Sequence, residues 1–308
     1  MEYKHLFIIG SPRSGTTWLQ SILSDNDNVA TTVETKTFPD YIFPLDNAYE
    51  KEAQQSRNLD WPFGLPHLMS EEEFQTVVKT VIDSIYSKIY ERNGRAVYIL
   101  EKHPMNVHYA TTILKYLPES KFIHIIRDGR EVVASMLKAR KNIGFGEKYV
   151  MAAAERWKSA VSDGRKVKKL TINYIEIRYE HLLEYPYQEV ERVFEFLGLK
   201  LSENELSKIV ADNKFEAAKE KLKAPDSTVK LNPQHFNSGK KDSWKKELSA
   251  NERYMVEIVA GPILQELNYS INKWWYSNTF QKYSVPFTVF IIRLYRRVIR
   301  TLKFGLAK

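Results

Sequence analysis

Residues 3–24 constrain the fold more than any other stretch of this sequence. Residues 6–9 are a short apolar run, Leu-Phe-Ile-Ile, which is typical of a buried parallel strand. A loop bounded by Gly10 and Gly15 follows, and residues 18, 19, 22 and 23 are then apolar at the spacing of one helix face. A strand, a glycine-bounded loop and a helix in this order are typical of an anion-binding cradle, because backbone N–H groups and the positive end of the helix dipole converge there.

The residues inside this loop favour phosphate binding over a plain turn. The glycines have the G-x-x-x-x-G spacing of the nucleotide-binding P-loop, but Thr16 and Thr17 stand where that loop has Lys and Ser or Thr. The fixed cation lies inside the loop instead, at Arg13. A strand-to-helix turn that needs glycine for its geometry alone is the alternative, and Arg13 and the paired threonines argue against it.

The composition excludes several classes of site and partner. The 308-residue chain has no cysteine, which excludes disulfides, thiolate metal sites and a cysteine nucleophile. Of the 46 Lys and Arg residues, eight follow Glu266, where no acidic residue occurs, and the other 38 balance the 38 Asp and Glu. The net charge of +8 is therefore a property of the tail, and a general nucleic-acid-binding surface is not indicated.

No signal-peptide or membrane-spanning segment precedes the first strand, so we expect a cytoplasmic protein.

Alternating strand and helix patterns predict the fold class. Further buried strands are expected at residues 97–100, 121–126 and 172–177, with helices between them and two or three more up to about residue 222. This alternation predicts an α/β fold in which a P-loop-type parallel sheet is flanked by helices on both faces, as one domain over residues 1–268.

Two stretches have no usable period. Residues 37–69 are rich in Pro and aromatic residues, and we expect an irregular loop or short-helix insertion that forms a wall of the substrate site. Residues 223–246 are typical of a functional lid or a disordered segment. Capping-box patterns at Ser70 and Ser249 predict that a helix begins just after each stretch.

The ends of the predicted strands carry a set of similar side chains. Arg13 follows the first strand, Lys102 the second, Arg127 the third and Tyr179 the fourth. In parallel α/β sheets, ligands bind at the carboxyl ends of the strands. Three cations and one aromatic ring at these ends point to an anionic nucleotide.

Three motifs follow one another along the chain. Residues 12–18 read Pro-Arg-Ser-Gly-Thr-Thr-Trp, Arg127 has Ser135 eight residues further on, and residues 178–182 read Arg-Tyr-Glu-His-Leu. Together they resemble the sulfotransferases that use 3′-phosphoadenylyl sulfate (PAPS), over about residues 4–268. The resemblance implies PAPS as co-substrate, held at its 5′-phosphosulfate by the first motif and at its 3′-phosphate by the second, with Trp18 and Tyr179 near the adenine. The donor contacts it implies are Pro12, Arg13, Ser14, Gly15, Thr16, Thr17, Trp18, Arg127, Ser135 and Tyr179.

Two shorter stretches are most similar to the tyrosylprotein sulfotransferases and their bacterial relatives. Glu34-Thr35-Lys36 comes 21 positions after the loop cation, and Lys102-His103-Pro104 comes 25 positions before the arginine of the second motif. Ser227 lies where the tyrosine enzymes have a catalytic serine. Pro104 stands where the cytosolic small-molecule enzymes have a catalytic histidine, so a histidine base at that position is excluded.

The late loop departs from the family pattern. It keeps Gly239 and a tryptophan, Trp244, but it lacks the Arg-Lys pair that clamps the 3′-phosphate in the cytosolic enzymes. Lys240 or Lys241 is the substitute, and the donor contacts expected from this loop are Ser238, Gly239 and Lys240.

The chemistry of sulfuryl transfer suggests a role for each remaining residue. An acceptor hydroxyl attacks in line and needs a general base, for which Glu34 is the first candidate and His103 the reserve. Arg13 and Lys102, with the amides of residues 14–17, can stabilise the developing negative charge. No metal is required, and the sequence has no convincing cluster of ligand-spaced residues. The structural alternatives for the charged residues are ion pairs of Glu34 with Lys36, of Lys102 with Glu101 and of Arg127 with Asp128. For Ser135 the alternative is a hydrogen bond to its own helix, and for Trp18 it is packing in the core alone.

Residues 269–308 form a basic tail. Residues 284–304 are apolar at a spacing of three to four, with Arg and Lys on the other faces, which predicts an amphipathic helical extension. Such a helix suits peripheral contact with an anionic membrane surface, which would be the inner face. The alternative is a helix that docks on the body or on a second subunit.

The sequence therefore predicts an enzyme that moves the sulfuryl group of PAPS to an acceptor hydroxyl. A carbohydrate or glycolipid acceptor is preferred because the tail favours membranes, and peptide tyrosine is the alternative because of the similarity around Glu34. A P-loop kinase is disfavoured, since Thr16 stands where a kinase P-loop needs lysine. A scaffold that binds no donor would tolerate the loss of Arg13, Lys102 and Glu34, and all three are present.

Overall fold

The computed structural model describes residues 3–94, 96–214, 217, 220, 241–271, 291 and 294. Five strands form one sheet in the order β2-β3-β1-β4-β5, and every neighbouring pair is parallel. In the centre of the sheet Leu6 lies opposite Leu100 on one side and Lys121 on the other. The strands are β1 (Lys4–Ile9), β2 (Val29–Thr31), β3 (Tyr98–Lys102), β4 (Lys121–Ile126) and β5 (Tyr174–Arg178).

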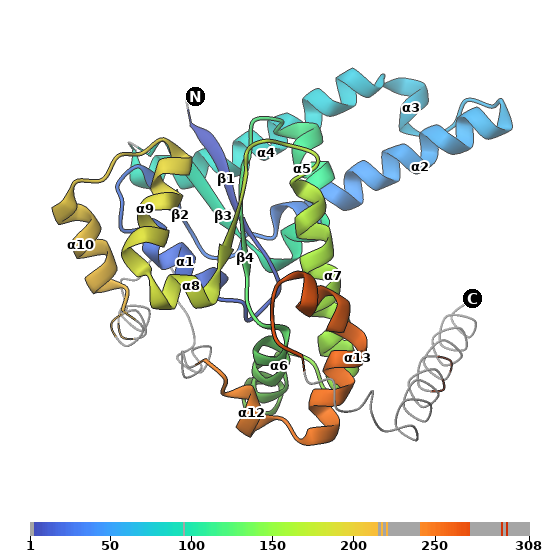
Figure 1. The fold of residues 1–308 in the computed structure, drawn as a ribbon. Coiled ribbons are helices and arrows are strands. Elements are labelled where there is room, and N and C mark those ends of the chain that lie inside the picture. The colour runs from blue at the N-terminus through green and yellow to red at the C-terminus, as the bar shows by residue number, and fades with distance from the viewer. Residues whose placement is uncertain are drawn as a thin grey trace.

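Helices connect the strands and surround the sheet (Figure 1). The first half of the chain has α1 (Thr16–Leu23), the π-helix η1 (Thr37–Ile42), α2 (Phe43–Leu59), α3 (Leu65–Leu68), α4 (Glu71–Asn93), the 3-10 helix η2 (Pro104–His108) and α5 (Ala110–Tyr116). The second half has α6 (Gly129–Ile143), α7 (Val150–Val167), α8 (Tyr179–Glu184), α9 (Pro186–Leu197), α10 (Glu203–Asp212), α12 (Trp244–Glu247) and α13 (Ala250–Glu266).

Both faces of the sheet are buried, as the apolar strands require. Along β1, Leu6 and Ile8 pack with α1, α8, α9 and α10 on one face, whereas Phe7 and Ile9 pack with α4, α5 and η1 on the other. A third cluster joins α6, α7, α12 and α13 beyond the end of β4. Because side chains alternate between faces, a strand that is covered on both sides is apolar at every position. The predicted α/β fold class is confirmed.

The prediction of an irregular loop or short helices for residues 37–69 is wrong, because the segment contains one long helix. The segment contains η1 and the 17-residue helix α2, which projects from the body together with α3 (Figure 1). Only Asp46, Tyr49 and Ala53 of α2 are buried, so the helix lacks the apolar stripe by which an amphipathic helix is recognised. The edge strand β2 was also missed, because three residues are too few to show a strand pattern.

Other boundaries agree with the sequence patterns. Ser70 and Ser249 each form a capping box at the start of α4 and α13, and Gly94 ends α4 in a left-handed conformation. No helix within the described ranges is long and apolar enough to cross a membrane. Residues 284–304 lie outside the described part of the chain apart from Ile291 and Leu294, so the predicted amphipathic helix stays a prediction.

Candidate active site

The loop after β1 has a left-handed backbone conformation at one glycine and at one arginine. Gly15 has a φ of 96°, and a Cβ there would lie 2.5 Å from Cδ2 of Tyr179. Arg13 is left-handed as well, with a φ of 73°. The backbone must therefore turn sharply below Tyr179, and only a residue without a side chain fits at position 15. This close approach, in addition to the turn, explains the second glycine of the motif.

The first turn of α1 faces the space enclosed by this loop. α1 begins at Thr16, and its N-cap, Gly15, has no side chain to accept hydrogen bonds from the first amides. Ser14 is buried, and its hydroxyl has no hydrogen-bond partner in the described ranges. Amides at a helix N-terminus, a buried hydroxyl and a nearby arginine are the donor set that a phosphate or sulfate group needs. The loop therefore fits the anion that its sequence predicted.

We call Arg13, Arg127, Ser135 and Tyr179 the donor end of the site. Nε of Arg13 donates to the Ser135 hydroxyl at 2.8 Å, and Nη1 of Arg127 donates to the Arg13 carbonyl at 3.4 Å. The Arg127 guanidinium lies 4.2 Å from the centre of the Tyr179 ring. Burial and the charge of Arg127 lower the pKa of Arg13 to about 10, so Arg13 remains a cation at neutral pH. Two cations held this close together favour binding of an anion between them.

Trp18 adjoins the donor end but also belongs to the core. Its indole N–H donates to the Asn213 carbonyl at 2.8 Å, and its ring meets Tyr179 edge-on with 5.4 Å between centroids. It packs in the cluster that includes Leu6 and Ile8. Packing in the core is thus one role of Trp18, and its contact with adenine stays a prediction.

We call Glu34, Lys102 and His103 the acceptor end. Nζ of Lys102 donates to Oε1 of Glu34 at 2.5 Å, and Nε2 of His103 lies 3.5 Å from the other carboxylate oxygen. The Lys102 side chain is only 3% exposed, whereas that of Glu34 is 38% exposed. Burial lowers the pKa of His103, so its imidazole is neutral at pH 7. A buried cation therefore orients a carboxylate that solvent and substrate can reach.

None of the three ion pairs given above as structural alternatives is formed among the described residues. Lys36 contacts Asp40 at 3.8 Å and does not pair with Glu34. Glu101 is buried beneath the site, so it is no surface partner for Lys102. Asp128 pairs with Arg130, while Arg127 contacts Glu131 at 3.5 Å.

One pocket connects the two ends. It has a volume of about 600 Å³ and includes Arg13, Thr16 and Thr17 of the phosphate loop together with Glu34 and Lys102. Most of its remaining wall is apolar or aromatic, and the side chains of η1 and η2 contribute to it. Its apolar and aromatic residues are Pro12, Val33, Pro39, Pro104, Met105, Tyr109 and Phe145, and its other polar residues are Gln20, Lys36, Asp40, His103 and Arg156. An acceptor in this pocket would meet the carboxylate, the lysine and the phosphate loop at once.

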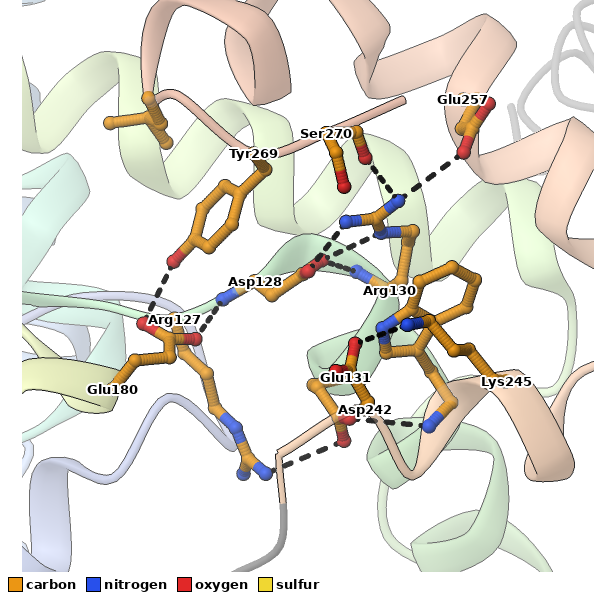
Figure 2. Close-up of polar contacts among 12 residues, drawn as sticks. Arg127, Asp128, Arg130, Glu131, Glu180, Asp242, Lys245, Glu257, Tyr269 and Ser270 are labelled. Carbon is orange, nitrogen blue, oxygen red and sulfur yellow. Dashed lines mark hydrogen bonds and ion pairs between the residues drawn. The ribbon is translucent and has the colours of Figure 1, made fainter. Parts of the chain in front are cut away.

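A second pocket of about 680 Å³ borders the donor end on the side of Arg127 and Tyr179. Figure 2 shows the charged network beside it, in which Arg130 donates to Asp128, Glu257 and the Ser270 carbonyl. Arg130 therefore has the structural role expected from its burial. Trp157 is also structural, since it is buried and donates to the Arg127 carbonyl at 3.0 Å.

The late loop reaches the donor end through Glu131. This buried carboxylate accepts from the Ser243 hydroxyl at 2.7 Å and from the Trp244 amide at 3.2 Å, besides its contact with Arg127. Sequence reasoning did not single out Glu131, although its position four residues after Arg127 on a helix was a usable signal. Ser227, Ser238, Gly239 and Lys240 lie outside the described residues. In the described ranges, no group of three or more His, Asp or Glu could hold a metal ion.

Comparisons with known proteins agree with this geometry. The chain matches the sulfotransferase family over residues 5–203, and it therefore belongs to that family. It is 26% identical over 216 residues to protein-tyrosine sulfotransferase 2 of Gallus gallus, covering 67% of this chain and 56% of that protein. It is 27% identical over 204 residues to protein-tyrosine sulfotransferase A of Caenorhabditis elegans, covering 63% and 50%. The chain thus spans about half the length of these two curated relatives.

Solved structures share the fold. Mouse sulfotransferase SULT7A1, crystallised with 3′-phosphoadenosine 5′-phosphate (PAP), aligns with a TM-score of 0.54 at 15% identity, over 85% of each chain. The sulfotransferase domain of the curacin biosynthetic pathway aligns with a TM-score of 0.55 at 19% identity, over 88% of this chain and 99% of that one. The prediction of a sulfotransferase fold is confirmed.

Proposed function

We propose that this enzyme transfers the sulfuryl group of PAPS to the phenolic hydroxyl of a tyrosyl peptide. The observation that carries the proposal is the pocket of about 600 Å³ in which Glu34 and Lys102 face the phosphate loop between apolar and aromatic walls. The names of the curated relatives point the same way. They support the alternative of the sequence analysis better than its preferred carbohydrate or glycolipid acceptor.

The donor end has the groups that a phosphosulfate nucleotide requires. Arg13, the hydroxyl of Ser14 and the first amides of α1 surround one anion position, and Arg127 with Ser135 surrounds a second. Tyr179 lies between them with its ring against Arg127. PAPS supplies the activated sulfuryl group and two further phosphate groups for these cations. The PAP bound in mouse SULT7A1 is consistent with this assignment.

The acceptor end supplies the proton transfer. Glu34 accepts the proton of the acceptor hydroxyl while the oxygen forms its bond to sulfur and the bond from sulfur to the 5′-phosphate oxygen breaks. Lys102 orients Glu34 and, together with Arg13, offsets the negative charge that builds on the transferred group and on the leaving oxygen. Because Lys102 is buried and bonded to Glu34, little reorganisation is needed when the reaction begins.

The walls of the pocket favour an aromatic acceptor. Tyr109, Phe145 and Met105 offer apolar and ring surfaces to a phenol, and aromatic pairs gain about 0.5–1.5 kcal/mol beyond burial of their area. A sugar ring would need several placed hydrogen-bond partners for its hydroxyls. Around Glu34 and Lys102 the pocket has seven apolar or aromatic residues, which suit a flat phenol ring better than a ring of hydroxyls.

The test has a binding step and a transfer step. Calorimetry with PAP in EDTA should show metal-independent binding, and transfer of labelled sulfate from PAPS should be faster to a tyrosyl peptide than to an oligosaccharide or glycolipid. Glu34→Gln should lower kcat about 10²–10⁴-fold, while Asp40→Asn, which changes an exposed carboxylate of the same wall, should not. Binding of ATP with Mg²⁺ but not of PAP would overturn the donor assignment. Faster transfer to the carbohydrate would overturn the acceptor assignment alone.

A further inference from the structure

A buried carboxylate lies directly beneath the acceptor end. Glu101, the residue before Lys102 in β3, is 3% exposed. It accepts hydrogen bonds from the Tyr86 hydroxyl of α4 and from the Asn106 amide of η2, the latter at 3.2 Å. The Thr35 side chain and the Thr37 backbone, in the loop that carries Glu34, lie beside this carboxyl group and oppose the rise of its pKa. Donors from two separate elements thus bond to Glu101, and the loop that carries Glu34 lies against it.

The loop and η2 adjoin residues of the acceptor end, whereas α4 does not. Thr35 adjoins Glu34, Glu101 adjoins Lys102, and Asn106 lies in the helix that follows His103. The loop after β2 needs an anchor, because Lys36 has a φ of 54°, a left-handed conformation that costs a residue other than glycine free energy. The residues on either side of Lys36 hold it there, since the Thr35 and Thr37 hydroxyls bond to each other at 2.7 Å and the Thr37 amide donates to the Thr35 hydroxyl at 3.4 Å.

The charge of Glu101 suits an anchor better than a packing residue. The neighbouring ammonium group, that of Lys102, is directed to Glu34, so Glu101 is satisfied by hydrogen bonds. Burial raises the pKa of Glu101, and its hydrogen bonds oppose that rise. An apolar side chain would fill the same space without this desolvation cost, but it could not bond the loop.

We propose that Glu101 is a positioning residue for sulfuryl transfer, which holds the Glu34 loop against β3 so that Glu34 and Lys102 stay at hydrogen-bonding distance. This inference rests on the proposed function, in which those two residues carry the chemistry. Glu101 touches neither donor nor acceptor, so it acts only through the loop. A displacement of about 1 Å at a reacting group can cost about 10²-fold in rate.

The decisive variant is Glu101→Gln, which keeps the shape but replaces one acceptor oxygen by a donor. It should lower kcat about 10–100-fold, with the KM of the acceptor and the affinity for PAP changed less than about twofold. Native-state hydrogen exchange of the Thr37 amide should become about tenfold faster or more. Thr35→Val leaves Glu101 in place, removes the hydroxyl that bonds to Thr37 beside Glu101 and should change kcat and exchange in the same directions, so it serves if Glu101→Gln fails to fold.

Asp46→Asn is the matched control. Asp46 is also a buried carboxylate that accepts from a tyrosine hydroxyl, that of Tyr116 at 2.6 Å, but it lies in α2 and adjoins no residue of the site. It should change stability without changing kcat or Thr37 exchange. The inference is overturned if Glu101→Gln affects kcat no more than Asp46→Asn does, or if the Thr37 amide keeps its protection. If the wild-type enzyme transfers no sulfuryl group, the proposed function fails, and the exchange experiment still decides whether Glu101 anchors the loop.

Discussion

The donor end and the acceptor end hold their positive charges differently. At the donor end Arg13 contacts a hydroxyl, and Arg127 lies on the face of an aromatic ring with the Glu131 carboxylate 3.5 Å away. The charge of Arg127 also contributes to the lowered pKa of Arg13. At the acceptor end Lys102 is bonded to a carboxylate of the same site. The first arrangement favours an incoming anion, whereas the second holds a cation and a base ready in fixed geometry. One end is therefore built for binding and the other for proton transfer.

The two ends are also held in place by different means. Backbone conformation fixes the donor end, where Gly15 passes directly below Tyr179. Side-chain hydrogen bonds hold the acceptor end, where Lys102 bonds to Glu34 and the adjoining Glu101 bonds to Asn106. A variant of one end should accordingly change either donor affinity or transfer rate, and four predictions test this division.

The largest effect is expected from Lys102→Met. Removing this cation should lower kcat about 10²–10³-fold, while the affinity for PAP changes little, because the 3′-phosphate position lies at the donor end. Steady-state kinetics with PAPS and a tyrosyl peptide, together with PAP calorimetry, measure the two quantities. Lys115→Met is the control, since Lys115 in α5 is also paired with carboxylates but lines neither pocket of the site. An equal loss of PAP affinity and kcat would contradict the division.

Gly15→Ala should damage the donor end through strain. The left-handed conformation costs about 1–2 kcal/mol for a residue with a Cβ, and the clash with Tyr179 adds to it. We expect the free energy of unfolding to fall by about 2–3 kcal/mol and PAP affinity to fall with it. Gly198→Ala has the same backbone penalty in open space, so denaturant unfolding of both variants isolates the contact with Tyr179. Equal destabilisation would show that the close approach is unimportant.

Arg127→Ala should weaken PAP binding about 10–150-fold, since a charge-assisted hydrogen bond contributes about 1.5–3 kcal/mol. At saturating PAPS, kcat should stay within about threefold of the wild type, because the reacting pair is untouched. Calorimetry and kinetics at high PAPS check both numbers. Arg192→Ala, which removes an exposed arginine paired with Glu189 in α9, should leave both unchanged. A large fall in kcat at saturation would place Arg127 in the chemical step.

Local sequence patterns place the donor end more directly than the acceptor end. Residues 12–18 are contiguous, and Arg127 lies two residues before α6, the helix that contains Ser135. Glu34 and Lys102 are 68 residues apart, and they meet because β2 pairs with β3. The sequence around Glu101 is charged and gives no sign that this residue is buried, because its burial depends on β3 lying inside the sheet.

The strands beneath the two ends carry buried groups whose pH dependence has opposite signs. His124 in β4, three residues before Arg127, is fully buried, and burial together with Arg165 and Arg178 lowers its pKa to about 3. Between that value and the ordinary histidine pKa, the unfolded chain binds a proton that the folded protein does not. His124 therefore lowers the free energy of unfolding as the pH falls from about 6.5 toward 3, by up to about 1.4 kcal/mol per pH unit. Glu101 in β3 has a raised pKa and acts oppositely, favouring the folded state as the pH falls.

His124→Gln should have the smallest effect at neutral pH, and it removes the contribution of His124 to the pH dependence of the free energy of unfolding. The amide can keep the hydrogen bond that His124 Nδ1 makes with the Tyr174 hydroxyl at 2.7 Å, and it does not titrate. Denaturant unfolding between pH 7 and 4 should show a slope that is smaller than that of the wild type by about 1.4 kcal/mol per pH unit at most. Part of the wild-type slope should remain, because burial also lowers the pKa of His5 in β1 to about 4. An unchanged slope would mean that the strand leading to the donor end opens to solvent before the protein unfolds, and the rigidity inferred for that end would then be wrong.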